Sequence, residues 1–222
     1  MITVWTNAQA GELLLDEAED LMVLEARNCS LGDDSSGWSP DFSSNQNLFS
    51  VDLIDNKLES ISFTGLDACE IFNVNNNRIS SLTDMSDALL LTHLEIANQA
   101  EDSGTKTLTG TLDVSGFPAL TDLQIYSNDI TELTCNSKMT TLNCNSNPSL
   151  TNIDATQVED FEQVVSVENC PLLTGIQMNP SPTTNNNNLS GLPQHGFKIV
   201  QGHTTSATAI IIDVPEDFTI WL

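Results

Sequence analysis

The feature of this sequence that most constrains its fold is an internal repeat. Each copy fits the frame L-x-x-L-x-L-x-x-N/C-x-L, and positions 4 and 6 of the frame are apolar in every copy. Successive copies start 27, 21, 22, 29, 19 and 23 residues apart. The copies are residues 21–31, 48–58, 69–79, 91–101, 120–130, 139–149 and 162–172. A repeat this short cannot bury its apolar face alone, so the pattern predicts a solenoid of stacked coils.

A second apolar run follows most copies of the frame. The runs are Leu58-Ile61-Phe63, Ile79-Leu82, Ile130-Leu133-Cys135, Leu150-Ile153-Ala155 and Leu173-Ile176-Met178. We therefore expect strand-like segments on two sides of each coil. Strands of successive coils stack about 4.8 Å apart. Positions 1, 4, 6 and 11 of the frame should point inward and fill one continuous core.

Position 9 of the frame carries a small polar side chain at the point where the backbone turns. Its residues are Cys29, Asn56, Asn77, Gln99, Asn128, Asn147 and Cys170. A side-chain amide both donates and accepts hydrogen bonds, so it can satisfy buried peptide groups of adjacent coils. The sequence therefore predicts a structural ladder of these residues along the solenoid.

This repeat resembles the leucine-rich repeat, especially the short type of internalin-like bacterial surface proteins. The resemblance covers about residues 21–178. It implies a mostly β leucine-rich-repeat solenoid of about seven coils. The copies depart from the family pattern at Gln99 and Glu101, and at Glu162, which starts the last copy.

The two ends of the chain are expected to cap the solenoid. Residues 1–20 form the predicted N-terminal cap, with a strand at 2–5, where Trp5 would plug the first coil, and a short helix around 12–21. Residues 179–222 form the predicted loop and C-terminal β-cap. Its turn-rich start, 179–197, precedes strand-like segments at 197–201, 208–214 and 218–222. These apolar terminal strands are buried either in the cap or against another subunit.

The charge of the chain excludes some partners. Asp and Glu number 31, against 6 Lys and Arg, which gives a formal net charge of −25. Such a surface repels nucleic acid and anionic lipid, so we expect no nucleic-acid partner. No apolar run is long enough to cross a membrane, and the first residues lack the basic start of a signal peptide. We therefore expect a complete short reading frame and no membrane insertion. The acidity itself fits solubility, a basic partner, cation binding or a salty habitat.

Residues that usually carry chemistry do not form a recognisable site. The cysteines fall at core or ladder positions of the frame, which predicts reduced, buried thiols: Cys29, Cys69, Cys135, Cys144 and Cys170. There is no C-x-x-C pair and no histidine at a ligand spacing, so no metal or cofactor is expected. No catalytic motif is present, and we expect the protein not to be an enzyme.

The resemblance places binding on the concave sheet of the solenoid. Outward positions of the middle coils gather an aromatic ring, an imidazole, amides and carboxylates, at His93, Glu95, Asp122, Gln124 and Tyr126. Such a mixture suits a glycan or a protein loop. The alternative, a solvated polar face, stays open.

Two insertions interrupt the period. Residues 32–47 carry Trp38 and Phe42 among Ser and Asp, which suits either a binding loop or a tolerated surface insertion. Residues 99–111 are polar, and there we favour a surface insertion without contacts.

We therefore expect a non-catalytic leucine-rich-repeat binding or assembly protein. The expected setting is the surface of a larger particle, such as a phage virion, as a decoration or tail-associated protein. Partner proteins or assembly subunits would dock on the apolar termini and on loop 32–47. The alternative is a bacterial adhesin-like protein that binds glycan or protein on its concave face. The virion and the cell surface are the two locations that these alternatives imply.

Overall fold

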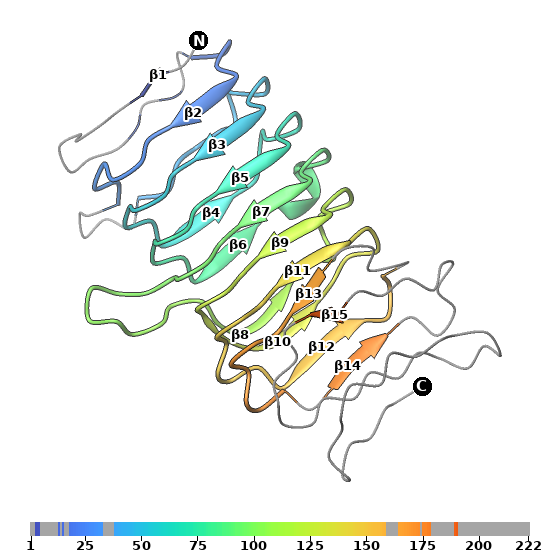
Figure 1. The fold of residues 1–222 in the computed structure, drawn as a ribbon. Coiled ribbons are helices and arrows are strands. Elements are labelled where there is room, and N and C mark those ends of the chain that lie inside the picture. Colours follow the sequence, from blue (N-terminus) through green and yellow to red (C-terminus); the bar gives the residue numbers. More distant parts are fainter. Residues whose placement is uncertain are drawn as a thin grey trace, which may run out of the picture. The chain divides into compact units, whose positions relative to one another are not determined.

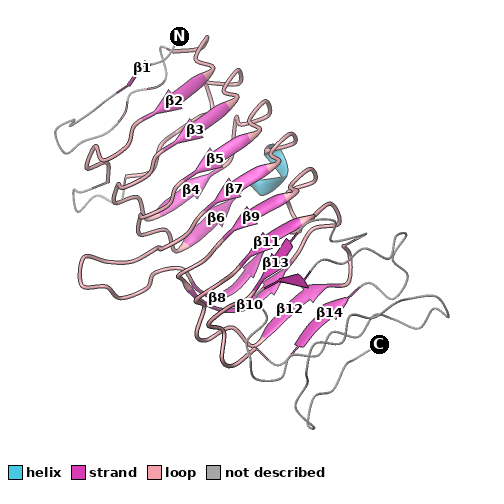
Figure 2. Cartoon of the chain, viewed as in Figure 1, coloured by secondary structure: helices cyan, strands magenta, loops and turns pink. Residues whose placement is uncertain are grey.

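The computed structural model describes residues 3–4, 13, 15, 18–32, 38–158, 164–173, 175–178 and 189–190. Nearly all of their regular structure is β, in parallel strands that repeat coil after coil as a β-solenoid of about six turns (Figure 2). Among the described residues, the one helix is a single 3-10 turn, η1 (Met85–Asp87). The expected mostly β solenoid is therefore confirmed.

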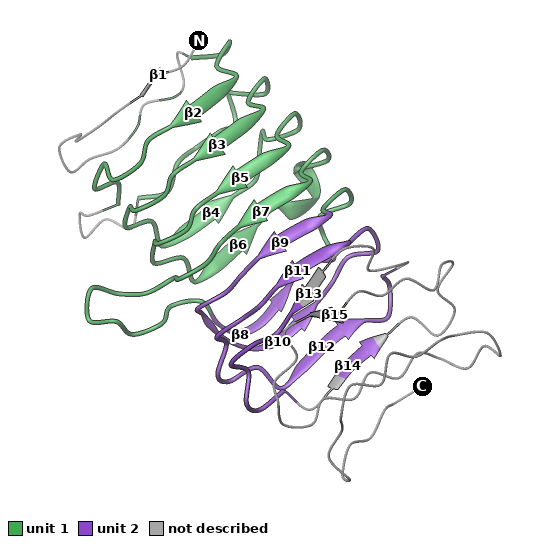
Figure 3. Ribbon diagram, in the orientation of Figure 1, with its two compact units in different colours: residues 1–108, 116–120 green, residues 109–115, 121–222 purple. Residues whose placement is uncertain are grey.

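The chain divides into two compact units (Figure 3). Unit 1 comprises residues 1–108 and 116–120, and unit 2 comprises residues 109–115 and 121–222. Each unit contains parallel strands on two sides of its coils, as the two apolar runs of each repeat predict (Figure 1).

In unit 1 the primary sheet contains strands of the repeat frame itself, in the order β1-β2-β3-β5-β7. Their bounds are β1 (Thr3–Val4), β2 (Val23–Glu25), β3 (Ser50–Asp52), β5 (Ile71–Asn73) and β7 (His93–Glu95). The second sheet pairs β4 (Ser60–Ser62) with β6 (Ser81–Thr83), also in parallel. The apolar triplet that starts at Leu58 thus forms a strand of its own, as expected.

Unit 2 repeats this arrangement. Its primary strands are β9 (Asp122–Gln124), β11 (Thr141–Asn143), β13 (Val164–Ser166) and β15 (Leu189–Ser190). Its second sheet contains β8 (Thr109–Asp113), β10 (Asp129–Thr134), β12 (Asn152–Ala155) and β14 (Gly175–Met178). The start of β8 lies in the segment 99–111 that the sequence suggested as an insertion. The apolar pattern did not indicate this strand, because Leu112 is its one buried apolar residue.

The short strands follow from the alternation of the frame. In β3, Val51 is fully buried while Ser50 and Asp52 on either side face outward. Position 6, which is Leu53 in this coil, is buried again after the strand has ended. This coil therefore inserts one aliphatic side chain from its primary strand and one from just beyond it into the core, and leaves the alternate ones on the surface.

Four phenylalanines are the largest fully buried side chains among the described residues, and all four lie in unit 1. The rings of Phe42 and Phe72 meet edge to face with centroids 6.0 Å apart, and Phe63 lies 5.1 Å from Phe72 and 4.8 Å from Phe117. Phe42 is only 1% exposed. Phe42, a candidate contact residue of loop 32–47, therefore places its ring in the core. Trp38 remains half-buried.

The same loop holds the N-terminal segment in place. Asn45 is fully buried, and its Nδ2 donates to the backbone carbonyls of Leu15 and Ala18, both at 2.9 Å. The expected helix at 12–21 is not seen in the described part of that segment, where Ala18 and Leu21 close successive turns. Trp5 and the expected strands of the C-terminal β-cap lie outside the described residues.

The residues at position 9 bind neighbouring coils together. The Oδ1 atom of Asn56 accepts hydrogen bonds from the backbone N–H groups of Cys29 (3.0 Å) and Leu31 (3.1 Å) in the preceding coil. Its Nδ2 donates to the carbonyls of Ala26 (2.7 Å) in that coil and Leu53 (2.9 Å) in its own. One buried side chain thus satisfies peptide groups of two coils.

The pattern recurs along each unit. Asn77, Gln99, Asn128 and Asn147 are all buried and donate to backbone carbonyls. Gln99 has one more methylene group than asparagine and still bridges two coils, donating to Val74 O (2.8 Å) and accepting from Ile79 N (2.9 Å). At the two ends of the set, the thiols of Cys29 and Cys170 donate to carbonyls instead.

Position 8 has a conformational role that sequence analysis missed. In every copy this residue has a positive φ, between 51° and 59°: Asn28, Asp55, Asn76, Asn98, Ser127, Ser146 and Asn169. Asn and Asp tolerate this left-handed region better than other residues with a side chain. The restriction of position 8 to Asn, Asp and Ser is therefore a backbone requirement of the turn.

Candidate functional site

The primary sheet of unit 1 presents a surface with two rows of side chains, which we call the primary face. The strand register aligns Val23, Ser50, Ile71 and His93 in one row and Glu25, Asp52, Asn73 and Glu95 in the other. Several of its polar groups are fixed by bonds between coils. Glu95 Oε2 accepts from the amides of Asn73 (2.8 Å) and Asn75 (2.6 Å), and Arg27 forms an ion pair with Asp52.

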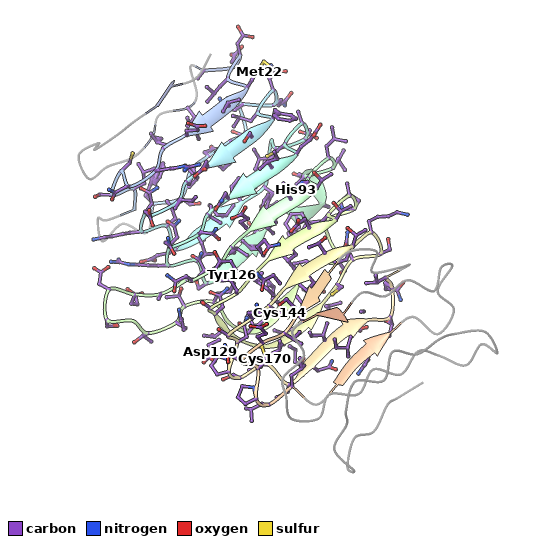
Figure 4. All side chains as sticks on the ribbon, viewed as in Figure 1. Met22, His93, Tyr126, Asp129, Cys144 and Cys170 are labelled. Atoms are coloured by element: carbon purple, nitrogen blue, oxygen red, sulfur yellow. The ribbon has the colours of Figure 1, made fainter. Side chains whose placement is uncertain are left out.

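Each unit contains part of the binding cluster predicted from sequence. In unit 1, His93 and Glu95 lie on β7, and the exposed His93 shares a 2.8 Å hydrogen bond between its Nδ1 and Thr92 Oγ1. In unit 2, Gln124 Nε2 donates to Asp122 Oδ1 at 2.6 Å on β9. Tyr126 follows β9 with an exposed ring; Figure 4 labels both His93 and Tyr126.

Exposed apolar side chains lie at the amino ends of strands of the primary face, in a group that we call the apolar ridge. Met22, Phe49 and Ile71 are 57%, 39% and 41% exposed. They come from successive coils and are linked through the backbone, because Phe49 N donates to Met22 O (2.7 Å) and Ile71 N to Phe49 O (3.3 Å). Figure 4 labels Met22 beside the start of β2. The apolar character of these residues was visible in the sequence, at positions 2 and 3 of the first three copies, where the repeat frame specifies no residue type.

The cysteines belong to the core. All of them are fully buried and none forms a disulfide in the described structure. Burial raises the pKa of Cys69 to about 12, and it also raises the pKa values of Cys135, Cys144 and Cys170. Because the thiolate is the reactive form, these thiols lack the properties of a nucleophile or a metal ligand.

Within the described residues, no group of three or more His, Cys, Asp or Glu side chains is arranged to hold a metal ion. None of the described helices has the length and apolar character that a membrane span requires.

A polar pocket of about 430 Å³ lies in unit 1, just beyond the carboxyl ends of β2, β3, β5 and β7. We call it the turn pocket. Its walls come from the turns at 28–30, 55–57 and 76–78 and from residues 98–106. The last segment is a hairpin, closed by an antiparallel bridge between Ala100 and Lys106 and by a hydrogen bond from Glu101 N to Thr105 O (2.8 Å).

Sequence analysis had no direct signal for the turn pocket. Lys57, Arg78 and Lys106 are far apart in the chain, and only the coil period brings the turns of different repeats together. The sequence favours a surface insertion without contacts at residues 99–111. This segment nevertheless supplies Glu101, Asp102 and Lys106 to the walls.

Comparison of the chain with protein-family models and with curated proteins finds no match.

Proposed function

We propose that this chain is a non-catalytic binding and assembly protein of the leucine-rich-repeat type, which docks a partner protein on the primary face of unit 1. The observation that carries this proposal is the apolar ridge of Met22, Phe49 and Ile71 beside polar groups that hydrogen bonds already fix. Apolar side chains ringed by polar ones are the composition of a protein interface.

Preorganisation supports a docking role for this surface. Glu95 is held by two amides and Asp52 by Arg27, so these side chains lose little further freedom when a partner arrives. Fixed groups reduce the entropic cost of association. With a net charge of −25, the chain attracts a partner that offers basic groups around an apolar centre.

The setting that we propose is the surface of a larger particle, such as a phage virion, where the chain serves as a decoration or tail-associated subunit. Mutual repulsion between acidic copies keeps the free protein dispersed, while the apolar ridge supplies attraction to a surface of opposite charge.

Substituting both Phe49→Ser and Ile71→Ser is expected to release the protein from its particle or complex. The reason is that these changes remove most of the exposed apolar area of the ridge without altering a buried side chain. Co-sedimentation of tagged protein with particles from its source measures the effect, and at least a tenfold loss of bound protein is expected. Leu172→Ser is the control, since Leu172 is an apolar residue of unit 2 that is 54% exposed and does not belong to the ridge. Equal retention of the double variant and the control would contradict the proposal.

The second candidate is an adhesin-like protein that binds glycan. The exposed ring of Tyr126, near the hydrogen-bonded pair of Asp122 and Gln124 in unit 2, favours it, because sugars stack on aromatic rings and bond to amides and carboxylates.

For this candidate, Tyr126→Ala is expected to lower binding on a glycan array at least tenfold, since it removes the ring on which a sugar would stack. Tyr126→Phe should retain most binding, because the ring remains. Glu95→Ala tests the corresponding surface of unit 1. An array signal that none of these variants changes would remove both surfaces from glycan recognition.

A further inference from the structure

The turn pocket brings together cationic side chains in a chain that has few of them, and its lining also contains the carboxylates of Asp55, Glu101 and Asp102. Lys57, Arg78 and Lys106 line it, and they are three of the 6 Lys and Arg residues of the whole sequence. The Arg78 side chain is only 15% exposed. A guanidinium that is partly removed from water interacts strongly with an anion, because screening there is weak.

The hairpin places two carboxylates on these cations, and the first is that of Glu101, whose Oε2 lies 3.4 Å from Arg78 Nε. Asp102 Oδ2 lies 2.8 Å from Arg78 Nη2 and 3.7 Å from Lys57 Nζ. The hydrogen bond from Arg78 is the largest cause of an Asp102 pKa below its ordinary value. The pocket thus has a cationic seat on Arg78 and Lys57 that the Asp102 carboxylate occupies.

The Asp102 carboxylate is easily exchanged for another anion, whereas Arg78 and Lys57, which hold it, are part of the stacked coils. The Asp102 side chain is 74% exposed and lies on a turn of the hairpin, so it regains full hydration at little cost if it leaves. Arg78 and Lys57 extend from turns of the stacked coils, and their side chains are only 15% and 29% exposed. A ligand carboxylate that enters the pocket more deeply than Asp102 would therefore displace it.

The rest of the pocket favours a polar ligand. A chain of side-chain hydrogen bonds runs along the wall of the pocket. Lys106 Nζ donates to Asn98 Oδ1 (2.7 Å), Asn98 Nδ2 donates to Asn76 Oδ1 (2.9 Å), and Asn76 Nδ2 donates to Asp55 Oδ1 (2.7 Å). The lining contains no aromatic ring and no large aliphatic side chain. Exposed amides and charges of this kind bond to hydroxyl groups on both their donor and acceptor sides.

We propose that the turn pocket binds a sugar acid, whose carboxylate replaces that of Asp102 on Arg78 and Lys57 while its hydroxyl groups contact Asn76 and Asn98. The site is separate from the apolar ridge and does not depend on the docking role of the primary face. The net charge of the chain does not prevent this binding, because at physiological ionic strength charges farther away than about 8 Å are largely screened.

Calorimetric titration at physiological ionic strength tests the site, with glucuronate as the probe and glucose and inorganic phosphate as comparisons. Saturable binding of glucuronate is expected, at least tenfold tighter than binding of either comparison. Glucose lacks the carboxylate, whereas phosphate lacks the hydroxylated ring. Equal affinity for glucose or phosphate, or no saturable binding of glucuronate, would overturn the proposal.

Variants locate the site within the chain. Asp102→Asn removes the internal competitor and is expected to tighten glucuronate binding about fivefold, the factor that corresponds to an exposed ion pair. Lys57→Gln and Arg78→Gln should abolish it, and Lys138→Gln in unit 2 is the control. Should Arg78→Gln fail to fold, Lys57→Gln and Asp102→Asn decide the question alone. Weaker binding by Asp102→Asn, or unchanged binding by Lys57→Gln, would refute the assignment.

Discussion

Asn56→Ala is expected to lower the free energy of unfolding by about 3–5 kcal/mol, one of the largest effects of any single substitution in the described structure. The Asn56 amide accepts from Cys29 N and Leu31 N and donates to the carbonyls of Ala26, Leu53 and Ile54. Alanine supplies none of these bonds, and a buried peptide group that loses its partner costs about 1–3 kcal/mol. Equilibrium unfolding in urea measures the change.

Asn56→Asp separates loss of hydrogen bonds from loss of volume. Aspartate keeps the shape of the side chain and an acceptor for the two N–H groups, but it turns a second oxygen toward three carbonyls. We expect it to be at least as destabilising as alanine at neutral pH. Asn47→Ala is the control, because Asn47 is exposed and its Nδ2 makes one hydrogen bond, to Glu19 O at 3.1 Å. If Asn56→Asp had near wild-type stability, the hydrogen bonds that the Asn56 amide donates to backbone carbonyls would contribute little to stability.

Gly65→Ala is expected to cost about 2–5 kcal/mol, from two sources. Gly65 has a φ of 82°, where a side chain costs about 1–2 kcal/mol. An added Cβ would also collide with Phe42 O and lie 2.7 Å from Ser43 Cα. Both atoms belong to the backbone of the loop that places Phe42 in the core, so neither can move without disturbing that packing.

Gly104→Ala provides a matched control for this substitution. Gly104 has a φ of 83°, almost the same as Gly65, but apart from its two chain neighbours no described residue has an atom within 4 Å of where its Cβ would be. The control therefore reports the conformational cost alone. Urea unfolding should show Gly65→Ala to be the more destabilising by about 1–3 kcal/mol, the usual cost of overpacking. Equal effects would mean that the loop around Phe42 adjusts freely.

The repeat allowed the strands and the ladder positions to be predicted because both depend on local periodicity. Position 4 is apolar in every copy, and Val51 shows why, since it enters the core between two outward neighbours. Gln99 was a departure from the family pattern, yet it lies in line with the asparagines and is fully buried. The repeat frame therefore predicted the position of Gln99 correctly, although glutamine is unusual there.

Features that depend on contacts between distant segments could not be predicted. Phe42 lies in a Ser- and Asp-rich loop, and nothing near it in sequence indicates that Phe72, thirty residues later, will receive its ring. The seat of Asp102 between Lys57 and Arg78 likewise requires coils that are folded and stacked. The positive φ at position 8 was different, because the Asn, Asp and Ser residues there were visible and only their meaning was missed.

The ladder gives the solenoid a direction, and this limits how the chain can grow by tandem duplication. Asn56, Asn77 and Asn147 each reach back to the coil before them, supplying its carbonyl with a donor and its N–H with an acceptor. A duplicated coil with asparagine at position 9 therefore supplies the hydrogen-bond donor and acceptor that the coil before it needs. The coil that carries Cys170 donates a hydrogen bond from this thiol to Cys144 O, but it has no side-chain amide at position 9. The coil before it closes its own turn with a hydrogen bond from Leu150 N to Asn147 O. Copies of asparagine-bearing coils can accumulate in the interior, whereas a cysteine-bearing coil is suited to an end of the array.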